Sequence, residues 1–146
     1  MKNKIKLLGI IAVVAIIGFS MAGCTEPGSN TYTVYIYDNS DAEINSAFGA
    51  GTVPIGDGWS QKILTGNRNT LLTATESAYA GGVNKSKQTG KSLSEIETMI
   101  NGTLTGNSSH FNAVEKTAII NELKSKNYVV SIGEGEGCGV IGIFKE

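Results

Sequence analysis

The sequence predicts an α+β fold: a two-layer domain in which an antiparallel or mixed sheet has about three short helices packed on one face. Three observations carry this prediction. Alternating β-branched and aromatic residues mark strands near both ends of the region behind the N-terminal apolar segment. Three helix-capping patterns lie between these strands. Neither the first strand nor the last pair could bury an apolar face alone, so we expect them to share one sheet.

The first predicted strand covers residues 31–37, where bulky side chains alternate between two faces. The two sets are Tyr32, Val34 and Ile36 on one face, and Thr33, Tyr35 and Tyr37 on the other. Because two tyrosines line the second face, we expect this face to be partly covered rather than open to water.

A short helix is predicted directly after this strand. Ser40 and Glu43 have the spacing of a capping box, in which each side chain binds the other residue's backbone N–H. Gly49 can end the helix. The apolar residues that fall on one helical face are Ile44, Ala47 and Phe48.

The middle of the chain has weaker signals. Residues 63–65 and 70–73 flank a polar stretch at 66–69, which predicts a hairpin with a four-residue loop. Residues 80–91 contain few large apolar side chains. We therefore expect an exposed loop there, with its lysines in solvent.

Two further capping patterns open helices in the C-terminal third. The pairs are Ser92 with Glu95, and Asn112 with Glu115. Gly102 follows the first of these helices. Lys124 and Lys126 fall in the last turn of the second, where they oppose the negative end of the helix dipole.

The last two predicted strands cover residues 128–132 and 138–144. Residues 133–137 read Gly-Glu-Gly-Glu-Gly, and glycines can take the positive φ values that a tight turn needs. We expect a hairpin whose strands pair with the first strand.

The N-terminus has the pattern of an export signal. Lys2, Lys4 and Lys6 precede an apolar run from Leu7 to Phe19. This run is shorter than the about 20 residues that a membrane-spanning helix needs, and it suits the central region of a secretory signal.

Met21-Ala22-Gly23-Cys24 resembles the lipobox of bacterial lipoprotein signal peptides, although leucine usually stands where this chain has Met21. The resemblance implies that Cys24 is acylated, for example with palmitate, and that the chain is cut before it. It divides the chain into a cleaved signal peptide (1–23), a lipidated tether (24–30) and a single small α+β domain (31–146). The alternative is an ordinary secretory signal or N-terminal membrane anchor in which Cys24 is incidental.

The resemblance also implies a location and a partner. The partner is membrane lipid, reached through acylated Cys24, and the location is the cell envelope. Thr25 stands where an aspartate would favour retention in the inner membrane of enteric bacteria. By that analogy the outer membrane is favoured if the cell has one.

Charge and cysteine content narrow the classes of function. Cleavage before Cys24 would remove three lysines and leave 9 basic residues against 13 acidic ones. This mild acidity argues against a nucleic-acid partner, which would need a basic face. Of the two cysteines, lipid would occupy Cys24, so no disulfide within the chain is expected.

The chain offers few candidates for catalysis. His110, its single histidine, follows Ser108 and Ser109, but no orienting carboxylate is signalled for a nucleophile–base pair. Cys138 is either a small buried hydrophobe, which we favour, or a reactive thiol. One histidine also excludes a multi-histidine metal site. We predict no metal and no cofactor.

Two other motifs have structural explanations. The glycines of residues 133–139 lead into a strand rather than a helix, and glutamates lie between them, so a phosphate-binding loop is not expected. The acidic residues of 38–43 lack the spacing of a calcium-binding loop and are explained by turn formation and helix capping.

Trp59 lies in a glycine-rich segment, and with Tyr79 it forms a candidate binding loop, although such a tryptophan more often fills the core. The leading hypothesis is a non-enzymatic, membrane-tethered binding or structural module with an unidentified envelope protein or glycan as partner. The alternatives are a small envelope hydrolase that uses Ser108, Ser109 or Cys138 with His110, and an adhesin or inhibitor that uses the Trp59 loop.

Overall fold

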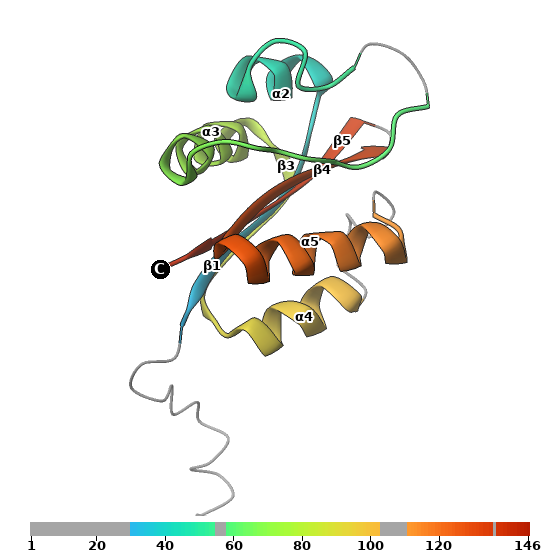
Figure 1. Cartoon of the computed structure of the whole chain (residues 1–146). Helices are drawn as coiled ribbons and strands as arrows, with labels where there is room; N and C mark the ends of the chain where they lie inside the picture. Colours follow the sequence, from blue (N-terminus) through green and yellow to red (C-terminus); the bar gives the residue numbers. More distant parts are fainter. Residues whose placement is uncertain (1–29, 55–57, 103–110, 136) are drawn as a thin grey trace, which may run out of the picture.

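The structure is a computed structural model that describes residues 30–54, 58–102, 111–135 and 137–146. It confirms the α+β fold class. Five antiparallel strands form one sheet in the order β2-β4-β5-β1-β3, and four helices pack against it (Figure 1). The elements are β1 (Tyr32–Asn39), α2 (Asp41–Phe48), β2 (Lys62–Ile63), α3 (Arg68–Gly81), β3 (Val83–Lys91), α4 (Leu93–Asn101), α5 (Ala113–Lys126), β4 (Tyr128–Gly135) and β5 (Gly137–Lys145).

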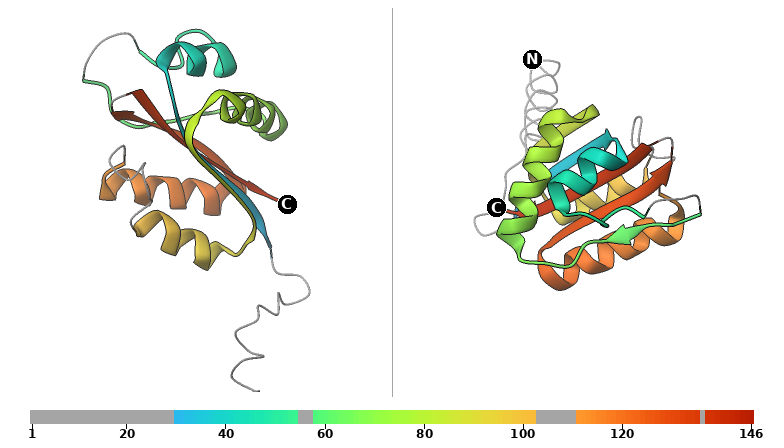
Figure 2. Two further views of the ribbon diagram at one scale, coloured as in Figure 1. Left: turned by 180° about the vertical axis from the view of Figure 1, so that it is seen from behind. Right: turned by 90° about the horizontal axis from the view of Figure 1, so that it is seen from above.

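The helices cover both faces of the sheet, whereas the sequence predicts helices on one face only. Helices α2 and α3 lie on one face and α4 and α5 on the other (Figure 2). The alternation in β1 explains this arrangement. Val34 and Ile36 enter the core on the α4 and α5 side, while Tyr35 and Tyr37 enter the core on the α2 and α3 side. The partial cover predicted for the tyrosine face is therefore full cover by two helices.

Each face of the sheet has its own apolar core. The core under α4 and α5 contains Tyr32, Val34, Ile36, Ile96, Ile100, Phe111, Ile119, Ile120, Leu123, Val129, Ile141 and Ile143. The core under α2 and α3 contains Tyr35, Tyr37, Ile44, Val53, Leu71, Ala78, Val130, Ile132, Cys138, Val140 and Phe144. Burial of apolar surface on both sides of three central strands is the main stabilising contribution.

Residues 68–81 form α3, so the predicted hairpin over 63–73 is wrong. Asn67 caps the N-terminus of α3, because its side chain accepts a hydrogen bond from the N–H of Asn69. Leu71, Thr75 and Ala78 then reach the core at helical spacing. The short apolar run at 70–73 was one turn of a helix with mostly small residues, a pattern that alternation alone cannot distinguish from a strand.

Residues 83–91 form the edge strand β3, so the predicted loop over 80–91 is also wrong. The strand pairs with β1, with Tyr35 opposite Lys87. Two register shifts interrupt the pairing, and Asn84 and Gly90 have positive φ values. Edge strands carry lysines and irregularities because these discourage pairing with other chains. Such a strand has no apolar alternation to reveal it.

The three predicted capping boxes all form, beginning with Ser40, Ser92 and Asn112. Helix α5 ends at Lys126 and is capped by Asn127, which has φ 65°. In its last turns Lys124 pairs with Glu97 of α4, and Lys126 pairs with Glu122. The first pair joins α5 to α4, and the second lies within α5. Helices α4 and α5 and strands β4 and β5 form where the sequence predicts helices and strands.

The last residue, Glu146, lies at the end of the sheet where β1 begins and binds the residues around it. Its carboxylate accepts hydrogen bonds from the Thr31 and Thr33 hydroxyls and from the N–H of Gly90. These donors keep the pKa of the Glu146 carboxyl below its usual value. The start of β1 and the end of β3 are therefore joined to Glu146 at one point.

Gly142 in β5 allows α3 to approach the sheet. A Cβ at this position would lie 2.7 Å from Cγ2 of the fully buried Thr75. We expect Gly142→Ala to lower the free energy of unfolding by about 1–3 kcal/mol, because the helix must shift to accommodate the methyl group. The midpoint of urea unfolding measures this loss.

Gly66→Ala is the matched control. A Cβ there would lie 3.5 Å from Leu71 in ordinary contact, so its effect should be about 0.5 kcal/mol or less. Equal stability of the two variants would contradict the close packing of α3 on β5.

Candidate functional site

Several residues singled out in the sequence lie outside the described residues. These are the lipobox residues Met21, Ala22 and Gly23, the lipidation site Cys24, and the hydrolase candidates Ser108, Ser109 and His110. The structure therefore bears on the remaining candidates, Cys138, Trp59 and Tyr79.

Cys138 is buried at the start of β5, as we had favoured, and lies in the core under α2 and α3. Its thiol donates a hydrogen bond to Oδ1 of Asp41 at 3.1 Å. Burial, reinforced by this carboxylate, raises the pKa of the thiol to about 12. Because the thiolate is the nucleophile, Cys138 is not a catalytic candidate in the folded domain. Its contact with Asp41 instead ties the first turn of α2 to the sheet.

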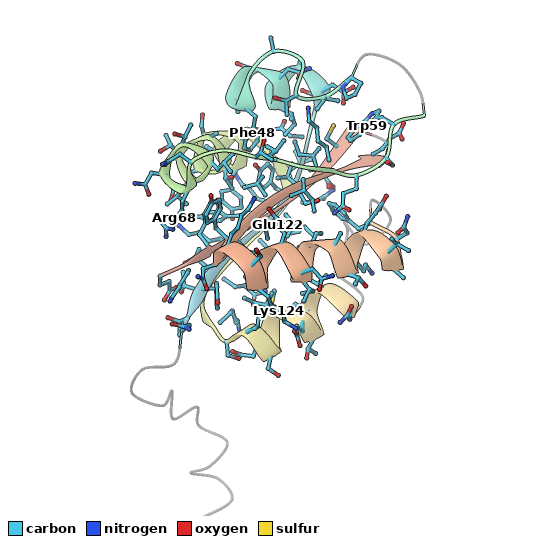
Figure 3. All side chains as sticks on the ribbon, viewed as in Figure 1. Phe48, Trp59, Arg68, Glu122 and Lys124 are labelled. Carbon is cyan, nitrogen blue, oxygen red and sulfur yellow. The ribbon has the colours of Figure 1, made fainter. Side chains whose placement is uncertain are left out.

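Trp59 and Tyr79 lie on different parts of the domain. Trp59 precedes β2 and is half-buried against the core under α2 and α3 (Figure 3). Tyr79 is part of α3, and its ring makes edge-to-face contacts with Tyr35 and Tyr37 at centroid distances of 5.5 and 5.6 Å. Strands β4 and β5 separate β2 from β1. The two aromatic residues therefore do not form one binding loop.

A groove between α2 and α3 is the concave feature that sequence reasoning missed. It consists of two adjoining hollows of about 210 and 590 Å³, which share Ser46, Ala47 and Ser77. We call this the α2–α3 groove. Its other lining residues are Asn39, Glu43, Asn69, Thr70, Thr73, Ala74, Ala78 and Gly81.

The lining of the α2–α3 groove consists mainly of hydroxyl, amide and methyl groups. Glu43 is acidic, but its carboxylate already accepts hydrogen bonds from the N–H and hydroxyl of Ser40. Asn39 is buried, and its amide binds the carbonyl of Ala78 and the N–H of Ser40. Such a surface can exchange hydrogen bonds with a polar ligand but holds no nucleophile–base pair.

The signal for this groove was present in the sequence. Small residues recur through 70–81 at spacings of three and four, which places them on one side of a helix. Small side chains let two helices lie close and leave space above the contact. The groove was missed because the hairpin expected over 63–73 divided this stretch.

Cations cover the aromatic cluster at the β3 edge. Nζ of Lys87 lies 4.9 Å from the centroid of the Tyr35 ring, and Nζ of Lys85 lies 5.4 Å from that of Tyr79. The Tyr35 hydroxyl donates to Glu76 at 2.8 Å. Burial and this carboxylate raise the pKa of Tyr35, so its phenol stays protonated. The cluster is explained by stabilising cation–π and hydrogen-bond contacts.

Two further findings concern only the part of the chain that the structure describes. None of its helices combines the length and apolar character required to cross a bilayer. No three of its histidine, cysteine, aspartate and glutamate residues gather where they could hold a metal ion.

The chain matches no protein-family model, no curated protein and no solved structure.

The environment of Cys138 predicts a thiol that resists modification. At pH 8 a pKa of about 12 gives a roughly thousand-fold smaller thiolate fraction than an unfolded cysteine has. In a Cys24→Ser chain, iodoacetamide should leave Cys138 unmodified in buffer and alkylate it readily in urea, as mass spectrometry would show.

A folded control places an exposed thiol in the same chain. Ser60 is exposed, so Ser60→Cys should be alkylated in buffer within minutes. Alkylation of Cys138 at the same rate as this control would contradict the buried, carboxylate-bonded thiol.

Proposed function

We propose that the chain is a lipid-anchored protein of the bacterial cell envelope, and that its domain is a non-enzymatic binding or structural module. The single observation that carries this proposal is the sequence Met21-Ala22-Gly23-Cys24 behind a basic and apolar N-terminus. The described domain starts with β1 at Tyr32, eight residues beyond Cys24. Lipid and fold are thus connected by a short segment.

The strength of the anchor follows from the number of acyl chains. One chain contributes about 0.8 kcal/mol for each buried CH₂ group and gives only reversible binding, whereas two or more membrane signals hold a protein stably. The lipoproteins that the lipobox resembles carry several chains. Attachment through Cys24 would therefore be durable.

The chemistry of the described residues supports a binding module more than a hydrolase. Cys138 is buried with a raised pKa, so the hydrolase alternative is left with Ser108, Ser109 and His110. The α2–α3 groove offers uncharged hydrogen-bonding groups that suit an envelope glycan or a peptide backbone. Trp59 is half-buried against the core, which favours the groove over the Trp59 loop as the binding surface.

The anchor predicts a defined response to loss of Cys24. Wild-type protein should incorporate radiolabelled palmitate and sediment with membranes. Cys24→Ser should incorporate none and should accumulate as an unprocessed or soluble form.

Cys138→Ala is the matched control, because it removes the other cysteine and should leave labelling and sedimentation unchanged. Continued acylation and membrane binding of Cys24→Ser would refute the anchor.

The groove predicts that a bulky side chain at its centre blocks partner binding. Ser77 is exposed and lines both hollows, so Ser77→Tyr should fill them without disturbing the core. Partners cross-linked to wild-type protein in intact envelopes should be reduced at least several-fold.

The control is Ser125→Tyr, a change at an exposed position of α5 on the opposite face of the sheet. If the two variants capture the same partners to the same extent, the groove is not the binding surface.

A further inference from the structure

One end of the domain contains the start of β1, the end of β5 and the ends of several other elements. Tyr32 at the start of β1 lies opposite Lys145 of β5 and Lys91 of β3. The guanidinium of Arg68, at the start of α3, donates to the carbonyl of Lys145. The N–H of Lys145 donates to the carbonyl of Asn127, just beyond α5. Figure 1 shows the C-terminus beside the start of β1. We call this the anchor end.

The opposite end of the sheet carries the β4–β5 turn. Gly135 pairs with Gly137 there, and Glu134 lies opposite Cys138. The backbone N–H of Gly58 donates to Glu134, so the segment that contains Trp59 also lies at this end. Figure 3 shows Trp59 and Arg68 at opposite ends of the sheet. We call this the outer end.

Two lengths decide how an anchored domain can stand on a bilayer. The start of β1 at Tyr32 lies eight residues beyond Cys24, so the connecting chain spans at most about 29 Å when fully extended. Strand β5 has nine residues and is about 30 Å long. If the outer end touched the lipid with the sheet upright, this chain would have to be stretched to its limit, and fixing every residue in one extended conformation costs conformational entropy. With the anchor end toward the lipid no such extension is needed.

We infer that the domain stands on the bilayer with the anchor end toward the lipid headgroups and the outer end directed away. This inference rests on the proposed acylation of Cys24. The β4–β5 turn, the Trp59 segment and the first turn of α2 then face away from the membrane. The part of the α2–α3 groove that is lined by Glu43 and Gly81 lies near this outer end and stays clear of the headgroups.

The distribution of charge favours the same orientation. At the anchor end the cations are Arg68, Lys91, Lys124, Lys126 and Lys145, and the side-chain carboxylates are Glu95, Glu97, Glu122 and Glu146. Three of these lysines are paired with Glu95, Glu97 and Glu122, and Glu146 accepts from the Thr31 and Thr33 hydroxyls. At the outer end the carboxylates are Asp38, Asp41, Glu43, Glu115 and Glu134, and the cations are Lys62, Lys85 and Lys116. The side chains therefore sum to +1 at the anchor end (5 minus 4) and to −2 at the outer end (3 minus 5), so anionic headgroups favour contact with the anchor end.

Energy transfer to the lipid surface tests the orientation. Full-length protein with Cys138→Ala is purified from membranes, and acylation of Cys24 is verified by mass spectrometry. Flotation with phosphatidylcholine vesicles then shows attachment. A donor dye is placed through Ser125→Cys near the anchor end or through Ser60→Cys near the outer end. Both side chains are exposed. The acceptor is rhodamine on phosphatidylethanolamine headgroups.

We expect transfer from position 125 to exceed transfer from position 60 at least two-fold. Twenty glycine and serine residues inserted after Asn30 should remove most of this difference, because the tether would then exceed the length of the sheet. Equal or reversed transfer with the natural tether would overturn the orientation, as would a difference that the insertion leaves unchanged. A chain that is not acylated or does not float would instead refute the proposed anchor.

Discussion

The fold depends on three central strands that are buried on both faces. In β1, β4 and β5, alternate side chains enter two separate apolar cores, so the sheet needs helices on both sides. Tyr37, Val140 and Ile132 serve one core, and Val34, Ile141 and Val129 serve the other. Of the described strands, only β4 and β5 are neighbours that follow each other in the chain. The other connections, through α2, through α3 and through α4 with α5, cross the faces of the sheet between strands that are not adjacent.

The layer with α2 and α3 relies on small residues and local polar contacts. The absence of a side chain at Gly142 lets Thr75 pack against β5. Asp41, the first residue of α2, accepts a hydrogen bond from the thiol of Cys138 in β5. Small side chains on the facing sides of the two helices leave the α2–α3 groove above the contact. The same packing that positions the helices thus provides a polar concave surface. It also buries the Cys138 thiol and keeps it protonated, so that it cannot act as a nucleophile.

The proposed anchor and the fold complement each other. The tether enters at the start of β1, where Glu146 binds Thr31, Thr33 of β1 and Gly90 at the end of β3. A force transmitted through the tether would act on β1, which is hydrogen-bonded to a strand on each side, and not on an edge strand. The α2–α3 groove and the Trp59 segment belong to the part of the domain that needs no contact with the membrane. This division suits a module that meets its partner above the lipid surface.

The sequence by itself determined the elements with strong local signals. Capping boxes at Ser40, Ser92 and Asn112, and alternation in β1, β4 and β5, are set by neighbouring residues and predicted α2, α4, α5 and three of the five strands. The lipobox assignment likewise rests on sequence alone. Tertiary structure decided the rest. Residues 83–91 became a strand because β1 offered a free edge. Residues 68–81 became a helix whose Leu71, Thr75 and Ala78 are buried at helical spacing, with Thr75 against Gly142. The small residues of 70–81 are visible in the sequence, but the α2–α3 groove forms only where this helix meets α2, which the tertiary structure decides.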